Sequence, residues 1–228
     1  MVPEYISIPE HLSDGINYKY KLMSIDVGIN NLGISITVWD ESWEKHRVIW
    51  VELIDVNVLT HNNVNRRDCN LHHTRHLVDK MEHLFQEYNN LFEQVDYIIV
   101  ELQPILGLKA VESLIFNKYR NKTFLVHPVK MHMFFNIKKH DYEKRKEFTI
   151  KIALMNIKDD EVLEQFNAHK RKHDMADSIC IMKYWVSKKR EQYIKEQKKI
   201  KAKEYFNTKK HVSMDDFFDR YKYKGSLK

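Results

Sequence analysis

The sequence predicts an α/β fold in which helices flank a mixed five-stranded sheet. Three short apolar segments follow one another early in the chain with short links, which is typical of an antiparallel meander. Two later apolar, β-branched segments alternate with segments of helical periodicity, which is typical of parallel βαβ units. One carboxylate interrupts the first apolar segment, and a buried charge must be paired or must coordinate a cation.

The first three strands are predicted at residues 20–27, 33–39 and 47–55. Residues 28–33 join the first two, and their sequence GINNLG contains the glycine and asparagine residues that tight turns favour. The sheet is therefore predicted to begin with a hairpin whose turn directly follows the interrupted strand.

The later elements alternate between helix and strand. Residues 71–92 place apolar side chains three and four positions apart, which predicts a helix with one apolar face. The run YIIVEL at 97–102 suits a central strand. Further elements are predicted as a helix at 109–119, a strand at 122–127, a helix at 142–156 and a helix that begins near 173. The order β-β-β-α-β-α-β-α-α is the pattern of the ribonuclease-H-like fold.

We expect three parts along the chain: an N-terminal arm at 1–18, a ribonuclease-H-like domain at 19–188 and a basic C-terminal extension at 189–228. Proline and an Asp-Gly turn break any regular pattern in the arm. Residues 188–210 contain ten Lys or Arg and three Glu, a net charge of +7. Two interpretations of this basic stretch stay open, a helix along a DNA arm and a solvated helix that packs on a partner subunit.

The composition favours an intracellular, soluble protein with a polyanionic partner. The formal net charge is +6 and the pI about 9.0, so nucleic acid is favoured over a membrane. Two cysteines far apart make no disulfide framework and suit a reducing compartment. The sequence shows neither a signal peptide nor an apolar run long enough to span a membrane.

Four acidic residues are the candidate catalytic and metal-ligating groups: Asp26, Glu101, Asp174 and Asp177. Asp26 lies in the first strand and Glu101 ends the fourth, so parallel pairing of the two strands would place them side by side. The two later acids are three positions apart and share one helix face. Singly, each is better explained as a turn, cap or solvated residue. Together they predict a site for two Mg²⁺ ions, with Mn²⁺ as a substitute, that hydrolyses a phosphodiester.

Basic residues near these acids are candidate contacts to DNA phosphates, although charge runs also simply solvate a helix. They are Lys144, Arg145, Lys146, Lys170, Arg171 and Lys172. His173, next to Asp174, is a candidate for proton transfer or a helix-start residue. The pattern C-x₂-H-H-x₂-H at 69–76 allows a zinc site, but a polar helix start explains it better, because closed zinc sites draw ligands from two elements.

Three acidic motifs in order, IDVGINNLGIS, IIVELQP and KHDMADS, resemble those of the RuvC-like Holliday junction resolvases, and most closely the type found in poxviruses and other large DNA viruses. Asp26 with Gly28, Glu101 with Gln103 and Pro104, and Asp174 with Asp177 match the motif positions. FLVHPVKM and YEKRKEFTI resemble the family's strand before a Pro-containing turn and its basic helix start. The resemblance covers about residues 20–188 and leaves out the tail.

The resemblance implies a homodimeric, Mg²⁺-dependent endonuclease that nicks four-way DNA junctions symmetrically during recombination or repair. A viral enzyme would act in the cytoplasm, and another would be mitochondrial or nuclear. The alternatives are another nuclease of this fold, such as one that cuts RNA–DNA hybrids, and a junction-binding protein without activity. An actin-like ATPase also begins with Asp-x-Gly, but it needs a second glycine-rich loop. Residues 34–224 contain a single glycine, Gly107, which argues against this alternative.

Overall fold

The computed structural model describes residues 14–57, 59 and 76–222, with side chains as far as residue 207. The chain divides into two compact units, Met1–Ser187 and Lys188–Lys228. Within the described residues, no helix is both long enough and apolar enough to cross a membrane.

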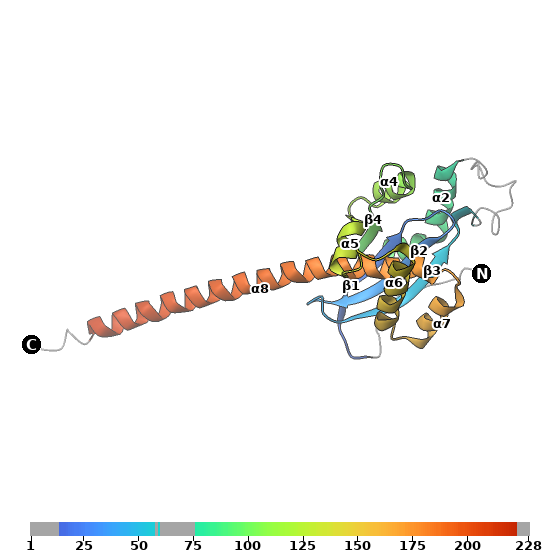
Figure 1. Cartoon of the computed structure of the whole chain (residues 1–228). Coiled ribbons are helices and arrows are strands. Elements are labelled where there is room, and N and C mark those ends of the chain that lie inside the picture. Colours follow the sequence, from blue (N-terminus) through green and yellow to red (C-terminus); the bar gives the residue numbers. More distant parts are fainter. Residues whose placement is uncertain (1–13, 58, 60–75, 223–228) are drawn as a thin grey trace, which may run out of the picture. The chain divides into compact units, whose positions relative to one another are not determined.

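The first unit is built on one five-stranded sheet (Figure 1). Its strands are β1 (Tyr18–Asp26), β2 (Leu32–Asp40), β3 (His46–Ile54), β4 (Tyr97–Glu101) and β5 (Thr123–Val126). Their order across the sheet is β3-β2-β1-β4-β5. The first three pair antiparallel, whereas β4 pairs parallel with both β1 and β5. The predicted mixed sheet with helices on its faces is confirmed.

Alternation along β1 separates a core face from a second face. Successive side chains of a strand point to opposite faces. Met23 and Ile25 belong to the main core cluster, whereas Leu22 and Ser24 are equally buried but lie outside it. Asp26 follows the pattern of Leu22 and Ser24, so it is directed away from the main core.

Among the described residues, helices α2 (Leu77–Glu87), α3 (Asn89–Gln94) and α4 (Lys109–Lys118) contribute to the main core. The prediction of a single helix at 71–92 is wrong in one respect, because the described part of this segment is broken at Tyr88 into two helices, α2 and α3. The Tyr88 ring is buried against Trp50, and its hydroxyl donates to Glu52 on β3 at 3.2 Å. The break lets Leu91 and Phe92 reach the same core.

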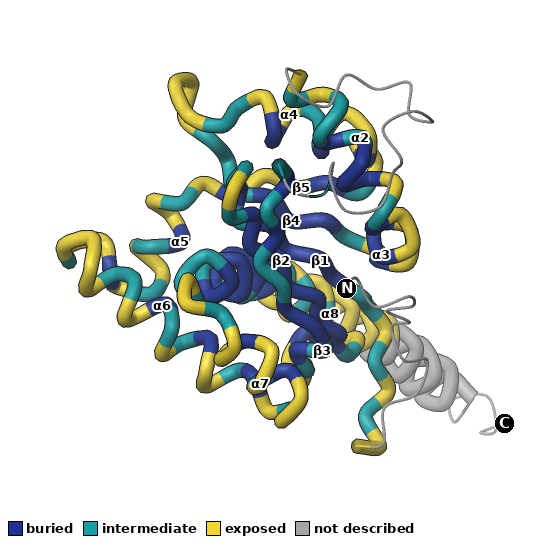
Figure 2. Tube along the Cα trace, turned by 90° about the vertical axis from the view of Figure 1, so that its right-hand side faces the viewer, coloured by how far each residue is buried: buried dark blue, intermediate teal, exposed yellow. Residues whose placement is uncertain are grey.

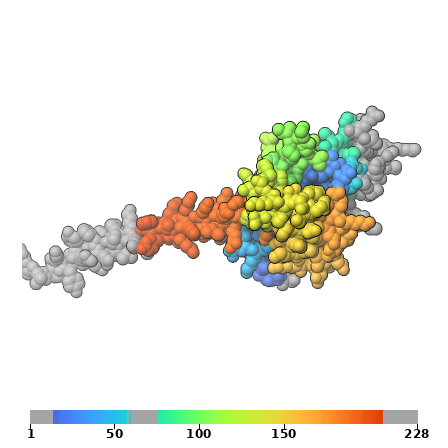
Figure 3. Space-filling view, viewed as in Figure 1, coloured from blue at the N-terminus to red at the C-terminus, as the bar shows by residue number. Residues whose placement is uncertain are grey.

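Four further helices follow: α5 (Pro128–Phe134), α6 (Tyr142–Asn156), α7 (Asp160–Ala168) and α8 (Lys172–Lys222). Figure 3 shows α6 and α7 forming much of one surface of the first unit. Helices α5 and α7 were not predicted from the sequence. Each of these helices begins at a residue that favours a helix start. Pro128 stands in the first turn of α5, where proline is favoured, and the Asp159 side chain caps α7 by accepting from the Glu161 and Val162 amides.

The part of α8 in the first unit is deeply buried, as Figure 2 shows for the backbone at the centre of this unit. Its apolar residues Met175, Ile179 and Met182 are fully buried. Trp185 packs on Tyr97 of β4, with ring centroids 5.2 Å apart. The prediction that this helix packs on the sheet is confirmed, and it brings the Asp174–Asp177 stretch to the face that carries Asp26.

Candidate active site

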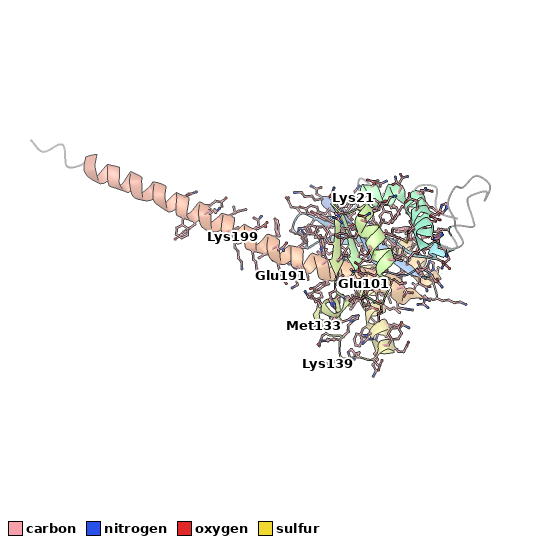
Figure 4. The ribbon with its side chains drawn as sticks, turned by 90° about the horizontal axis from the view of Figure 1, so that it is seen from above. Lys21, Glu101, Met133, Lys139, Glu191 and Lys199 are labelled. Atoms are coloured by element: carbon pink, nitrogen blue, oxygen red, sulfur yellow. The ribbon has the colours of Figure 1, made fainter. Side chains whose placement is uncertain are left out.

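Asp26 and Glu101 lie side by side at the carboxyl ends of two adjacent parallel strands. Ile25 of β1 pairs with Val100 of β4, so the next residue of each strand is acidic. Glu101, labelled in Figure 4, and Asp26 share a hydrogen bond in which the carboxylic acid of Asp26 donates. The sequence-predicted juxtaposition of these two residues is therefore present.

Asp174 and Asp177 enter from the first turns of α8. Both act electrostatically on Asp26, so the structure brings all four predicted acids together. Asp177 accepts a hydrogen bond from Thr149 of α6. Its Oδ1 atom is buried and has no hydrogen-bond partner within the described residues. A buried anionic oxygen without a partner is costly, so this atom is suited to a cation ligand.

Gly33 allows α8 to come this close to the sheet. It lies opposite Asp26 in the β1–β2 ladder. A Cβ atom at Gly33 would overlap the backbone carbonyl of Asp174 and lie 3.0 Å from the amide nitrogen of Met175. Only glycine fits between these two backbones, and the close approach places Asp174 beside the strand that bears Asp26.

Burial and mutual repulsion shift the acid pKa values upward. Burial raises the pKa of Asp26 well above its usual value, and Glu101, Asp177 and Asp174 raise it further. Burial likewise raises the pKa of Glu101, and it raises the pKa of Asp177 to about 7. The protein alone thus does not neutralise the cluster, and protons or a cation must do so.

A hydrogen-bonded chain that the sequence analysis did not predict fixes Glu101. The Gln103 side-chain amide donates to Glu101 Oε2 at 2.5 Å, and the Gln103 backbone amide donates to Glu112 Oε2 at 2.6 Å. Glu112 is only 2% exposed, and its other oxygen accepts from Lys109 at 2.5 Å. In the sequence Glu112 resembles an ordinary acid in the first turn of a helix.

Two of the six predicted basic residues act on the acid cluster, and a third acts on His173 beside it. Arg145 lowers the pKa of Asp177, and its guanidinium donates to the His140 carbonyl at 3.1 Å. Arg171 Nε donates to Asp174 Oδ2 at 3.0 Å. Lys146 acts on His173. These cations lie at the site itself, where DNA phosphates would approach.

The other three basic residues have different surroundings. Lys144 pairs with Asp141 at 3.4 Å, Lys172 donates to Asn167 at 2.8 Å, and Lys170 is exposed. The predicted contacts of all six with DNA remain a proposal. Three members of the zinc pattern, Cys69, His72 and His73, lie outside the described residues.

The acids fit divalent cations by their chemistry, although their side chains are not arranged around an ion. Within the described part of the chain, no group of three or more His, Cys, Asp or Glu side chains forms a ready metal site. One reason is that Asp174 is engaged by Arg171 and by His173 Nε2, which lies 3.2 Å from Oδ1. Hard carboxylate oxygens and the unpartnered Asp177 Oδ1 suit Mg²⁺ or Mn²⁺ once Asp174 turns from these partners.

Gly33→Ala is expected to destabilise the protein by about 1–3 kcal/mol, because the added methyl group must push α8 away from β2. Thermal unfolding monitored by circular dichroism measures this loss. An unchanged melting temperature would contradict the close approach. If the variant folds, the interaction between Asp174 and Asp26 should weaken, because Asp174 would move away from β1.

Comparison with solved structures finds a set of DNA-junction enzymes. The fowlpox virus Holliday junction resolvase matches with a TM-score of 0.53 and 16% sequence identity, over 74% of this chain and 99% of that chain. A complex of fowlpox virus resolvase with substrate Holliday junction DNA matches with a TM-score of 0.53 and 18% identity, over 74% of this chain and 97% of that chain. The yeast mitochondrial resolvase Ydc2 matches with a TM-score of 0.54 and 18% identity, over 81% of this chain and 84% of that chain.

The chain has the fold of the Holliday junction resolvases. No protein-family model and no curated protein matches it. The resolvase fold spans almost all of the fowlpox chain but leaves about a quarter of this chain unmatched. The additional residues have no counterpart in that neighbour.

Proposed function

We propose that this protein is a metal-dependent endonuclease that cuts four-way DNA junctions. The observation that carries the proposal is the convergence of Asp26, Glu101, Asp174 and Asp177 on one face of a resolvase fold. The basic balance of the chain and the cations beside the acids support a nucleic-acid substrate. The junction DNA bound by the fowlpox neighbour supports branched DNA as that substrate.

The four acids would hold two Mg²⁺ or Mn²⁺ ions. When bound, such ions supply the positive charge that favours attack of water on a phosphodiester and stabilises the leaving oxygen. The chain's own residues prepare the site. Gln103 and Glu112 fix the orientation of Glu101, and Thr149 holds one oxygen of Asp177. Arg145 is placed to attract the phosphate.

His173 is a candidate proton acceptor at the edge of the site. It is half-buried, and its Nε2 atom lies 3.2 Å from Asp174. Burial lowers its pKa, and Lys146 and Arg171 lower it further, against the opposing effect of the Asp174 carboxylate. A neutral imidazole beside the acids can take up a proton during hydrolysis.

The loop after β4 exposes two aliphatic side chains close to Glu101. Ile105 is 92% exposed and Leu106 is 100% exposed. A turn closed by the Gly107 amide donating to the Pro104 carbonyl at 2.9 Å presents them. Aliphatic side chains inserted between base pairs unstack and kink DNA, and a junction centre is already partly open. We propose that this loop contacts bases at the branch point.

Replacement of Ile105 and Leu106 by serine is expected to weaken junction binding about tenfold, equivalent to about 1.4 kcal/mol. Affinity for linear duplex DNA should change by less than about twofold, because phosphate contacts dominate it. Fluorescence anisotropy with both DNAs measures the two effects, and the exposed positions make loss of folding an unlikely explanation. An equal loss of affinity for both DNAs would show that the loop does not recognise the branch point.

We further propose that the enzyme acts as a homodimer, because symmetric nicks in two opposing strands require two equivalent sites. The protein would act in the compartment that contains the DNA that it processes. Sedimentation of the protein with and without a junction tests the dimer, which should be present at the concentrations that give paired nicks.

The deciding experiment uses an immobile four-way junction, labelled on each strand in turn, with Mg²⁺, Mn²⁺ or EDTA. We expect paired, symmetry-related nicks only with a divalent cation. Cutting of RNA–DNA hybrids but not of junctions would show that the substrate is an RNA–DNA hybrid and not a four-way junction. Tight junction binding without cutting, across junctions of varied core sequence, would indicate a binding protein.

A further inference from the structure

The second unit contains a lysine-rich face on a regular helix. Residues 188–222 belong to α8, and residues 188–207 are almost entirely exposed. Lys188, Lys195, Lys199 and Lys203 follow one another at intervals of seven, four and four positions. Because an α-helix has 3.6 residues per turn, these intervals place all four on one face, which we call the lysine stripe. Figure 4 labels Lys199 in this stripe.

The charge pattern of the stripe differs from that of a helix stabilised by its own ion pairs. Lys195, Lys199 and Lys203 form two successive like-charge pairs at i,i+4, and such pairs destabilise a helix. Glu191 offsets the first part of the stripe: it pairs with Lys188 at 2.9 Å and also acts on Lys195. A solvated helix would instead alternate the two signs along a face.

The side of the helix opposite the stripe has a mixed composition. It carries Tyr193 and Gln197 together with Arg190 and Lys201, all about a third to half a turn from the stripe. The stripe itself runs about 22 Å from Lys188 to Lys203, since each residue adds about 1.5 Å. Cations spread over this length can contact phosphates along about two thirds of one turn of a DNA duplex, which is about 34 Å long.

We propose that the lysine stripe binds the phosphate backbone of duplex DNA, as a site separate from the acidic cluster. The stretch 188–210 has a net charge of +7, which exceeds the +6 of the whole chain. Since the phosphates of DNA neutralise the repelling lysines, binding removes the unfavourable pairs within the helix. The choice of DNA as the polyanion rests on the proposed function, whereas the stripe itself rests on spacing and exposure.

The test compares two full-length triple variants with equal charge loss. The stripe variant replaces Lys195, Lys199 and Lys203 with glutamine. The control variant replaces Arg190, Lys198 and Lys201 with glutamine, which lie about a quarter to half a turn away from the stripe. Glutamine retains nearly the helix propensity of lysine and arginine, so circular dichroism should show equal helix content for both.

The measurement is the affinity of each variant for a short linear duplex over a range of salt concentrations. The stripe variant should bind at least about tenfold more weakly, and its logarithmic salt slope should shrink by about 2–3, because each phosphate contact contributes about 0.9. The control variant should change affinity less than about threefold. Equal losses in both variants, or no loss in either, would overturn the proposal.

Junction cutting by the same proteins separates this inference from the proposed function. If no protein cuts a junction but the stripe variant alone loses duplex binding, the stripe stands and the nuclease proposal fails. If all proteins cut junctions and bind duplex equally, the nuclease stands and the stripe is overturned. In that case, sedimentation of the wild type and the stripe variant shows whether the lysine stripe of α8 instead contacts a second copy of the chain.

Discussion

Asp26→Asn is expected to abolish junction cutting while leaving junction binding close to normal. The other three acids all raise the pKa of Asp26, so we place this residue at the centre of the proposed metal site. Losing it should slow single-turnover cutting by about 10³-fold or more, the scale on which one electrostatic group contributes to catalysis. Binding depends mainly on basic side chains, which the substitution leaves in place.

The matched control for this variant is Asp160→Asn, which removes one exposed carboxylate from the first turn of α7. It should cut at nearly the normal rate, because the acid lies on the surface of another helix. The asparagine variant at position 26 should also fold, since asparagine is uncharged, has nearly the shape of the protonated acid and can still donate a hydrogen bond to Glu101. Normal cutting by Asp26→Asn, or failure of that variant to fold, would contradict the assignment.

The second large effect is a pH-dependent stabilisation by Mg²⁺. Burial raises the pKa of Asp177 from 3.8 to about 7, so the folded protein binds more protons than the unfolded chain between these values. Stability of the metal-free protein should therefore fall as pH rises from about 4 to about 7 and stay low above it. Mg²⁺ should raise the melting temperature at pH 8 far more than at pH 5, because protons compete for the same oxygens.

Asp177→Asn provides the comparison for this effect. It removes an uncompensated buried charge, so the metal-free variant should melt at least about 2–4 °C above the wild type at pH 8, equivalent to about 1 kcal/mol. The variant should also lose most of the Mg²⁺-induced shift. Scanning calorimetry in EDTA and in Mg²⁺ across pH measures both. A Mg²⁺ shift of equal size at pH 5 and pH 8 would argue against cation binding at these acids.

The sheet was predictable because its signals are local or follow from pairing rules. Apolar segments located the strands, and the expected ribonuclease-H-like strand order, with the fourth strand parallel and next to the first, placed Glu101 beside Asp26. The helices α5 and α7 were missed because each is short and is started by one residue, Pro128 or Asp159, rather than by a long periodic pattern. The break at Tyr88 depends on a contact with β3, which lies far away in the sequence.

The four acids were predictable as a set, but their surroundings were not. Glu112 lies in a helix, and its role follows only from the position of the Gln103 amide. Gly33 looks like a turn residue in the sequence, yet its importance comes from the backbone of Asp174, which approaches it in three dimensions. The pairing of Arg171 with Asp174 was also hidden, because adjacent charges in a sequence do not reveal side-chain direction.

The close approach of Gly33 to Asp174 also sets when activity can arise during synthesis. Asp26 and Glu101 leave the ribosome well before α8, and they cannot form the complete cluster until that helix docks against β2. A nascent chain that has folded only its strands would hold two of the four acids. The proposed nuclease would thus stay inactive through most of translation, because its acid cluster is complete only after α8 has been made and has docked.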